Sequence, residues 1–340
     1  MICLPDEESS AGVSVVTVTY GDRWKYLSRQ LQYLENDSRI ERVIVVDNGA
    51  HRPIAPLTAE AGLHKVRVVR IERNLGSGAG FRLGLEVLAP LHPGWIWLLD
   101  DDNLPEPSAL GTIIATADLL QSHERRTCAF LAFRPEHQND IATGIDVRRC
   151  FPPHSSFFGF HVADIPYKVW RRLPRRAVAT EMPAQVSLPY APYSGLFFHR
   201  LMFAAIGTPR AELVLYADDT EFSHRIVKAG GSIRLLTGAL LIELEPSWNS
   251  KSRTSNSFES WLKGGSDLRV FYASRNQAYF ESQYWLRSKF LYRLNRFTYL
   301  AILRFYAWHF RAYDRYRLFR RAIVLGENGR LGVAMDYPLP

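Results

Sequence analysis

The first hundred residues alternate between short apolar runs rich in β-branched side chains and longer stretches with helical spacing. Apolar runs bounded by turn residues are typical of buried strands, and apolar positions three and four residues apart are typical of helices. Helices are expected over Trp24–Leu34 and from the glycine series after Asn74 to Leu88. The pattern predicts four strands, over Val13–Thr19, Arg42–Val46, Val66–Ile71 and Trp95–Leu99.

Strands that alternate with helices at this spacing predict βαβ units, and therefore a mainly parallel sheet with helices on both faces. Ligands of such sheets bind beyond the carboxyl ends of the strands. Polar residues follow three of the predicted strands, namely Asp47, Asn74 and Asp100–Asp102. We therefore expect an α/β, Rossmann-like fold with its functional site along this edge.

The middle of the chain is less regular. Residues 134–192 are rich in proline, arginine and aromatic residues, which predicts irregular, partly antiparallel structure and a substrate loop. The string Tyr216–Phe222 is expected to open a helix that runs to Ala229, followed by two short strands over Ser232–Leu236 and Ala239–Leu244.

The composition is that of a folded protein. In 340 residues, 47% are hydrophobic and 22% charged, which excludes disordered and fibrous classes. Three widely spaced cysteines form neither a disulfide framework nor a C-x-x-C metal site, so we expect a reducing compartment. The start of the chain lacks the pattern of a secretory signal, and no apolar stretch approaches the roughly 18 residues of a membrane span. A soluble cytoplasmic protein is the expectation.

Positive charge is concentrated near the C-terminus. The net charge is +8, yet residues 262–330 alone hold 14 Lys and Arg against 4 Asp and Glu. This segment is also expected to be helical from Asp267 to about Leu325. A nucleic acid, an anionic membrane or an acidic substrate could bind there.

Three short motifs contain groups that suit catalysis. Adjacent carboxylates such as Asp100–Asp102 are costly unless a cation neutralises them, although a solvated acidic turn is the alternative. Because alternate strand residues point the same way, Asp100 and Asp102 could share Mg²⁺ or Mn²⁺. The glycines of Arg73–Gly80 allow close approach to a phosphate, or form a tight turn. Asp218-Asp219 could cap a helix or supply a general base.

Together these strings resemble the inverting glycosyltransferases of family 2, which have the GT-A fold. The likeness extends from residue 13 to about residue 280. The D-D-x-E-F and Y-x-x-R-N strings are most similar to the bacterial galactofuranosyl- and rhamnosyltransferase branch, which builds surface glycans. The matching segments in chain order are Val15–Tyr20, Val45–Gly49, Arg73–Gly76 with Ala79-Gly80, Leu98–Pro105, Ser194–Phe198, Tyr216–Arg225 and Phe271–Asn276.

The resemblance implies roles for individual residues. Asp100 and Asp102 would form a metal-binding D-x-D motif that links Mn²⁺ or Mg²⁺ to the donor diphosphate. Asp219 would be the base that deprotonates the acceptor hydroxyl, with Asp218 and Glu221 contacting the acceptor. The nucleotide of the donor would be bound by Thr19, Asp47, Asn74, Gly78, Asp100 and Asp101.

One position departs from the resemblance. Members of this branch often supply a histidine as a further metal ligand on the strand after the base helix, and this chain has none there. Glu243 and Glu245 alternate onto one face and could replace it with oxygen ligands. They could equally form an exposed strand edge.

The expected organisation is a GT-A catalytic domain over residues 1–265 and a basic, aromatic helical region over residues 266–340. Within the catalytic domain, residues 13–133 would bind the nucleotide sugar and residues 134–265 the acceptor. The resemblance implies transfer from a UDP-galactofuranose or dTDP-rhamnose type of donor to a glycan or lipid-linked acceptor, in cell-surface polysaccharide synthesis.

The C-terminal region contains one further pattern. An apolar stripe at helical spacing has arginines beside or opposite it, as in helices that lie on anionic membranes. A core-facing helix or a dimer contact are the alternatives, and the oligomeric state is left open. The membrane interpretation would place the protein at the inner face of the cell membrane. The stripe consists of Leu286, Phe290, Leu294, Phe297, Ala301, Phe305 and Trp308.

Two other functions fit the sequence less well than transfer of a sugar. A nucleotidyltransferase would have a Gly-rich basic loop after the first strand, whereas this chain has Tyr20-Gly21-Asp22-Arg23. A nucleic-acid-binding protein would fit the pI near 9.4, but no DNA- or RNA-binding module is recognisable. We therefore expect no nucleic-acid partner.

Overall fold

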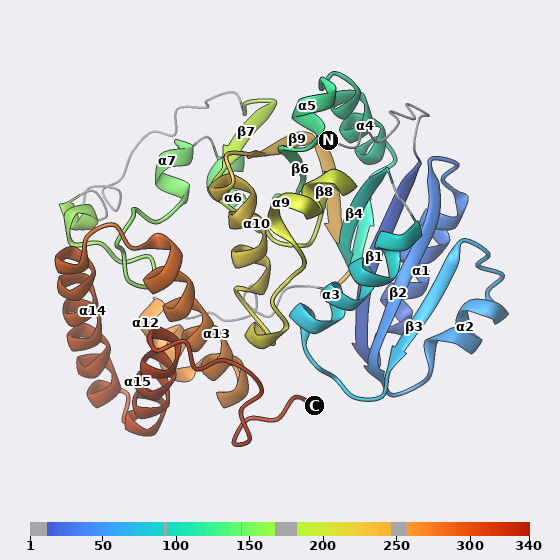
Figure 1. Cartoon of the computed structure of the whole chain (residues 1–340). Coiled ribbons are helices and arrows are strands. Elements are labelled where there is room, and N and C mark those ends of the chain that lie inside the picture. Colours follow the sequence, from blue (N-terminus) through green and yellow to red (C-terminus); the bar gives the residue numbers. More distant parts are fainter. Residues whose placement is uncertain (1–11, 92–93, 144, 167–181, 246–256) are drawn as a thin grey trace.

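The computed structural model describes residues 12–91, 94–143, 145–166, 182–245 and 257–340. Within these residues nine strands form one sheet, in the order β3-β2-β1-β4-β8-β6-β9-β5, with β7 paired to β9 as well (Figure 1). The strands are β1 (Val13–Gly21), β2 (Ile40–Ala50), β3 (Val66–Ile71), β4 (Trp95–Asp100), β5 (Asn103–Pro105), β6 (Cys128–Phe133), β7 (Gln185–Leu188), β8 (Leu196–His199) and β9 (Ser232–Glu243).

The sheet confirms the α/β prediction and is parallel where the N-terminal pattern predicted it. Strands β3, β2, β1 and β4 are all parallel neighbours. The other half is mixed, because β8 is antiparallel to β4 and β6, while β9 is antiparallel to β5 and β7. The two strands predicted over 232–244 are one strand, β9. Its early residues pair with β6 and β7, and its last residues pair with β5. The strand therefore continues through the glycine at 238, because it has backbone hydrogen-bond partners on both sides of that residue.

Helices cover both faces of the parallel half because successive strand residues point to opposite sides. Val15 lies in the core cluster with Leu27 of α1, whereas Val16 lies in the cluster with Phe81 and Leu85 of α3. The remaining longer helices of this part are α4 and α10. The helices up to β9 are α1 (Trp24–Asn36), α2 (Ile54–Glu60), α3 (Ser77–Leu88), α4 (Ala109–Asp118), α5 (Ser122–Arg125), α6 (Asn139–Ala142), α7 (Val147–Cys150), α9 (Phe203–Ile206) and α10 (Asp218–Lys228).

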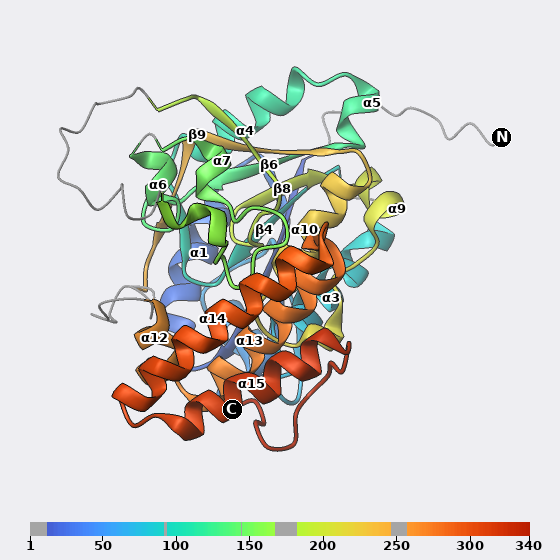
Figure 2. The same cartoon turned by 90° about the vertical axis from the view of Figure 1, so that its left-hand side faces the viewer.

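The C-terminal region is helical, as predicted, and has a core of its own. This core includes the buried side chains of Tyr272, Leu303 and Phe319. The helices stand beside α10 at the end of the sheet opposite β3 (Figures 1 and 2). They are α12 (Ser257–Lys263), α13 (Asp267–Phe280), a π-helical turn (Glu281–Trp285), α14 (Lys289–His309) and α15 (Tyr313–Glu327). A domain boundary at residue 265 stays a prediction.

Candidate active site

An acidic cluster follows β4 at the carboxyl edge of the sheet. Parallel pairing sets Thr19 opposite Asp47 and Val18 opposite Asp100, so the ends of three strands meet there. The Thr19 hydroxyl donates a hydrogen bond to Asp101 at 2.7 Å. Sequence reasoning missed Arg23, which follows β1 at this edge. Its Nε lies 2.8 Å from both carboxylate oxygens of Asp101, and its Nη2 lies 2.9 Å from Asp102.

Burial makes this cluster hard to ionise. Desolvation, with further repulsion from its neighbours, raises the pKa of Asp100 to about 7. Desolvation also raises the pKa of Asp101 to about 6, although the Arg23 guanidinium opposes the shift, and it raises the pKa of Asp102. Arg23 contacts Asp101 and Asp102, whereas no hydrogen bond to the Asp100 carboxylate is found among the described residues. Arg23, together with the charge of Arg134 acting on Asp100, therefore balances only part of the negative charge of the three carboxylates.

These oxygens fit a divalent cation in part. Hard cations such as Mg²⁺ prefer carboxylate oxygens and keep ligands from water and phosphate. In the part of the chain that the structure describes, no group of three His, Cys, Asp or Glu side chains is arranged to hold a metal. The protein would therefore supply Asp100 and Asp102, and the remaining ligands would come from a diphosphate and water.

The side chains of Asp47 and Asn74, both predicted to bind the nucleotide, form hydrogen bonds with other residues of the protein. The fully buried Asp47 carboxylate accepts hydrogen bonds from the amides of Ala50 and Ile54, and from Arg70 at 2.6 Å. The side-chain oxygen of Asn74 accepts bonds from the Asn48 amide group and from the backbone of Gly76. These bonds hold the loops at the ends of β2 and β3 in shape, so both residues line the predicted edge.

The backbone ahead of α10 has an uncommon conformation. Three non-glycine residues have positive φ angles, which are costly for side chains with a Cβ and worst for a β-branched one. The Asn276 side chain on α13 holds this turn, because its Nδ2 donates to the carbonyls of residues 213, 215 and 216 at 2.5, 2.8 and 3.0 Å. The three residues are Val214 (67°), Tyr216 (67°) and Ala217 (57°).

This turn also contacts the glycine series at the start of α3. A Cβ on Gly76 would stand 2.0 Å from the Val214 carbonyl oxygen, so only glycine fits there. Gly78, another predicted nucleotide-binding residue, is similarly confined, with the Arg210 carbonyl 2.9 Å from where its Cβ would be. The Ser77 hydroxyl donates to Asp218 at 2.8 Å. The glycine series and the D-D motif, far apart in the sequence, are therefore packed together.

The two aspartates of the D-D motif have different surroundings. Asp218 is 2% exposed and accepts the Ser77 bond, whereas Asp219 is half-buried and lines a cavity of about 470 Å³. Burial raises the pKa of both carboxyls, and the charge of Asp219 adds to the rise at Asp218. A carboxylate with a raised pKa that faces a cavity has the properties of a general base.

Arg134 and His137 line the same cavity and were not singled out from the sequence. Arg134 Nη1 and His137 Nε2 lie 2.8 and 2.6 Å from one oxygen of Glu243. Burial would raise the pKa of Glu243, but the bond from His137 and the charge of Arg134 outweigh it and lower the pKa. Glu245 is 2.5 Å from Arg23. Both glutamates are thus ion-paired near the acidic cluster, and a metal-binding role for either stays a prediction.

Glu221, predicted to contact the acceptor, lies inside the protein. It is 1% exposed, accepts a hydrogen bond from the Tyr284 hydroxyl at 2.9 Å, and lies 3.3 Å from Arg225. In this structure its carboxylate joins α10 to the π-helical turn. A direct bond to a substrate stays a prediction and would require these partners to move.

Comparison with known proteins gives a family match and two similar curated proteins. Residues 14–122 match the model of the family described as Glycosyl transferase family 2. The chain is similar to Galactofuranosyltransferase GlfT1 of Mycobacterium tuberculosis, with 27% identity over 228 residues, covering 64% of this chain and 65% of that protein. GlfT1 of Mycolicibacterium smegmatis is 24% identical over 226 residues, covering 64% and 66%. The match thus spans slightly under two thirds of the length of these curated relatives.

Two solved structures that match this chain have low sequence identity and TM-scores below 0.5. The structure of S. aureus TarS 1-349 in complex with UDP-GlcNAc is 14% identical, with a TM-score of 0.44, covering 82% of this chain and 68% of that chain. The structure of GalNAc-T7 with UDP, GalNAc and Mn²⁺ is also 14% identical, with a TM-score of 0.48, covering 84% and 54%.

Proposed function

We propose that this chain, which carries a glycosyltransferase family 2 domain, transfers a sugar from a nucleotide-sugar donor to an acceptor hydroxyl with inversion at the anomeric carbon. One observation carries the proposal. The acidic cluster after β4 borders the cavity that Asp219 lines, because Asn103 pairs with Glu243 of β9, and Glu243 contacts Arg134 and His137 of that cavity. Such a pair of acidic sites suits transfer, because one can hold a cation for a leaving diphosphate while the other accepts a proton.

The donor would lie along the carboxyl edge of the parallel strands. Asp100 and Asp102 would hold Mn²⁺ or Mg²⁺, which when bound would neutralise charge on the donor diphosphate. Thr19 and Arg23 hold Asp101 in place at 2.7 and 2.8 Å, and thereby orient the carboxylates on either side of it. The glycines at the start of α3 let the turn ahead of α10 pack closely against this helix, and Asp47 and Asn74 shape the loops that would border the nucleotide.

The acceptor would enter the cavity that Asp219 lines. Asp219 would take the proton of the acceptor hydroxyl while that oxygen forms a bond to the anomeric carbon. The bond from the anomeric carbon to the diphosphate breaks in the same displacement, and the nucleoside diphosphate leaves with the electron pair. Asp218 faces Ser77 in the protein interior, which supports Asp219 as the base of the pair.

The GlfT1 relatives support a bacterial cell-surface pathway and a UDP-galactofuranose type of donor, with a dTDP-rhamnose type as the second choice. The acceptor would be a glycan or a lipid-linked glycan. Such acceptors place the reaction on the cytoplasmic side of the cell membrane, where the protein would act as a peripheral enzyme.

A screen of UDP- and dTDP-sugars tests this proposal. Transfer or slow hydrolysis of at least one donor is expected with Mn²⁺ or Mg²⁺, and donor binding should be lost in EDTA and in Asp102→Ala. Asp118→Ala, which removes an exposed aspartate at the end of α4, is the matched control and should bind normally. Undiminished donor binding in EDTA overturns the metal requirement, and failure of every donor in the panel overturns the transfer.

A further inference from the structure

Helix α14 has two apolar faces, and the structure buries only one of them. Its buried residues pack against the other C-terminal helices. From Phe290 to Trp308, the face predicted as an apolar stripe points the other way, so it is not a core face. Leu286, predicted as its first member, precedes the helix and packs against the core instead. Its large side chains are Phe290 and Phe297, each 74% exposed, Trp308 at 62%, Phe305 at 59% and Leu294 at 38%. The buried face consists of Tyr292, Asn295, Tyr299, Leu300, Leu303 and Ala307.

The exposed face is long and continuous. At 1.5 Å per residue, the helix rises about 27 Å between Phe290 and Trp308. Figure 2 shows α14 across the near side of the molecule, with no other described element in front of it. An apolar stripe of this size is more than the scattered exposed side chains that soluble proteins normally carry. It therefore indicates a surface that something covers.

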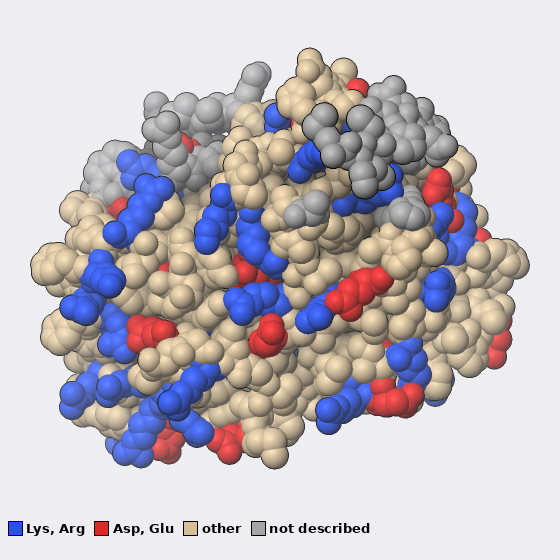
Figure 3. Space-filling view, in the orientation of Figure 1, with Lys and Arg blue, Asp and Glu red and all other residues tan. Residues whose placement is uncertain are grey.

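The charges beside the stripe indicate which kind of partner would cover it. The 21 residues of α14 include four basic residues and no acidic one. Arg293 and Arg304 are exposed and, at 100° per residue, lie along one border of the stripe. Figure 3 shows Lys and Arg atoms gathered over α14 and α15, with uncharged surface between them at the left edge. Aromatic side chains bordered by arginines fit the interface of an anionic bilayer.

A second copy of the chain fits this face less well. In a two-fold contact the same patch meets itself, so α14 would face a helix that also has no acidic residue. The arginines at the border would then have no opposite charge on the partner helix. An anionic bilayer supplies that charge along the whole length of the helix.

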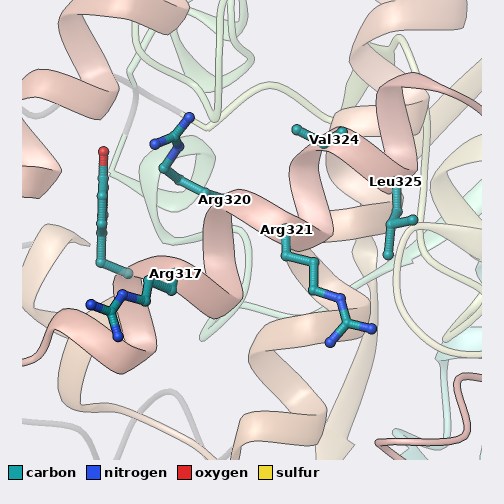
Figure 4. Close-up of a pocket in the computed structure, with 6 residues that line it drawn as sticks. Arg317, Arg320, Arg321, Val324 and Leu325 are labelled. Carbon is teal, nitrogen blue, oxygen red and sulfur yellow. The ribbon is translucent and has the colours of Figure 1, made fainter.

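The neighbouring helix α15 has basic residues too, but a different surface. A hollow of about 390 Å³ on it is lined by Tyr316, Arg317, Arg320, Arg321, Val324 and Leu325 (Figure 4). Arg317 lies 3.2 Å from Asp314, and Arg321 lies 2.9 Å from Asp336. Acidic partners already balance part of this charge, and the apolar side chains of the hollow are few. The α14 face is therefore the stronger membrane-binding surface.

We propose that α14 lies flat on an anionic phospholipid surface, with Phe290, Phe297 and Trp308 inserted among the lipids and Arg293 and Arg304 at the headgroups. No described helix is both long and apolar enough to cross a bilayer, so contact along one face is the mode that this surface offers. The proposal concerns a face outside the candidate active site and does not depend on the proposed reaction.

Sedimentation of the full chain with vesicles tests the proposal. Phosphatidylcholine vesicles with and without phosphatidylglycerol are compared at low and high salt. We expect binding to the anionic vesicles that falls with salt but does not vanish, because salt screens the arginines and not the apolar contact. The double variant Phe297→Ser/Trp308→Ser should bind at least roughly tenfold more weakly. The double variant Arg293→Gln/Arg304→Gln should lose the part of vesicle binding that depends on the salt concentration.

Two controls test whether a loss of vesicle binding is specific to the exposed face of α14. Leu119→Ser changes a side chain that is 83% exposed after α4, and it should bind vesicles like the wild type. Melting temperatures of all variants should stay close to the wild type, because the changed side chains are exposed. Wild-type protein that stays in the supernatant at low salt overturns the proposal. So does a wild-type dimer that Phe297→Ser/Trp308→Ser converts to monomer without any vesicle binding.

Discussion

The turn ahead of α10 depends on one buried side chain, Asn276. In Asn276→Ala the carbonyl of Leu213 keeps two donors, Arg275 at 3.3 Å and the Leu215 amide at 2.7 Å. The loss therefore falls on the carbonyls of Leu215 and Tyr216, whose bonds to Asn276 are 2.8 and 3.0 Å long, and on the buried Arg275 Nε, which donates to the Asn276 side-chain oxygen at 2.9 Å. A buried polar group left without its partner costs about 1–3 kcal/mol. With three groups affected, we expect the free energy of unfolding to fall by at least about 3 kcal/mol.

The same change should also reduce turnover. Asp219 is the second residue of α10, two residues after Ala217. Tyr216 and Ala217 keep their positive φ angles only while the surroundings hold them. Displacement of a catalytic group by about 1 Å can cost about a hundredfold in rate. We expect kcat to fall about 10- to 100-fold, with the donor KM changed less than about threefold, when measured well below the melting temperature.

Asn295→Ala is the matched control, because Asn295 is fully buried and also bonds backbone groups, the amide of Val162 and the carbonyl of Ser155. It lies on α14, away from the turn. Denaturant titrations and steady-state kinetics of both variants separate stability from positioning. The reasoning is wrong if Asn276→Ala keeps its kcat, or if Asn295→Ala lowers kcat to the same extent.

Two further predictions concern the D-D motif. Asp219→Asn should leave donor binding intact and lower turnover by a factor of about 10² to 10⁴. If Asp219→Asn instead has near-normal turnover and Asp218→Asn is the more damaging change, the assignment of the base within the pair is reversed. Because burial raises the pKa of Asp218 and Asp219 above the ordinary 3.8, the folded protein holds these protons more tightly than the unfolded chain. Their contribution should therefore make the metal-free protein less stable as pH rises from about 5 to about 8. Denaturant titrations should show a smaller decline in Asp218→Asn, and an identical slope in both proteins would contradict the pKa argument.

The parallel half of the sheet and the location of the site could be predicted from local pattern. Runs of β-branched residues bounded by turn residues delimit Val66–Ile71 correctly, although it is a partly exposed edge strand, and delimit the other parallel strands within a few residues. Strands joined by βαβ crossovers run in the same direction, so their carboxyl ends lie at one edge of the sheet. This is why the sequence alone places Asp47 and Asp100 at one edge.

The contacts that hold the site together were decided by the tertiary structure. Arg23 meets Glu245, and Arg134 meets Glu243, across more than a hundred residues of chain, and such pairs leave no periodic signal. The strained turn at Val214 is also set by a distant residue, Asn276. For α14, apolar spacing identified a helix with an apolar stripe but could not tell which face is buried. Periodicity describes one helix at a time, whereas burial depends on which neighbours the folded chain brings to each face.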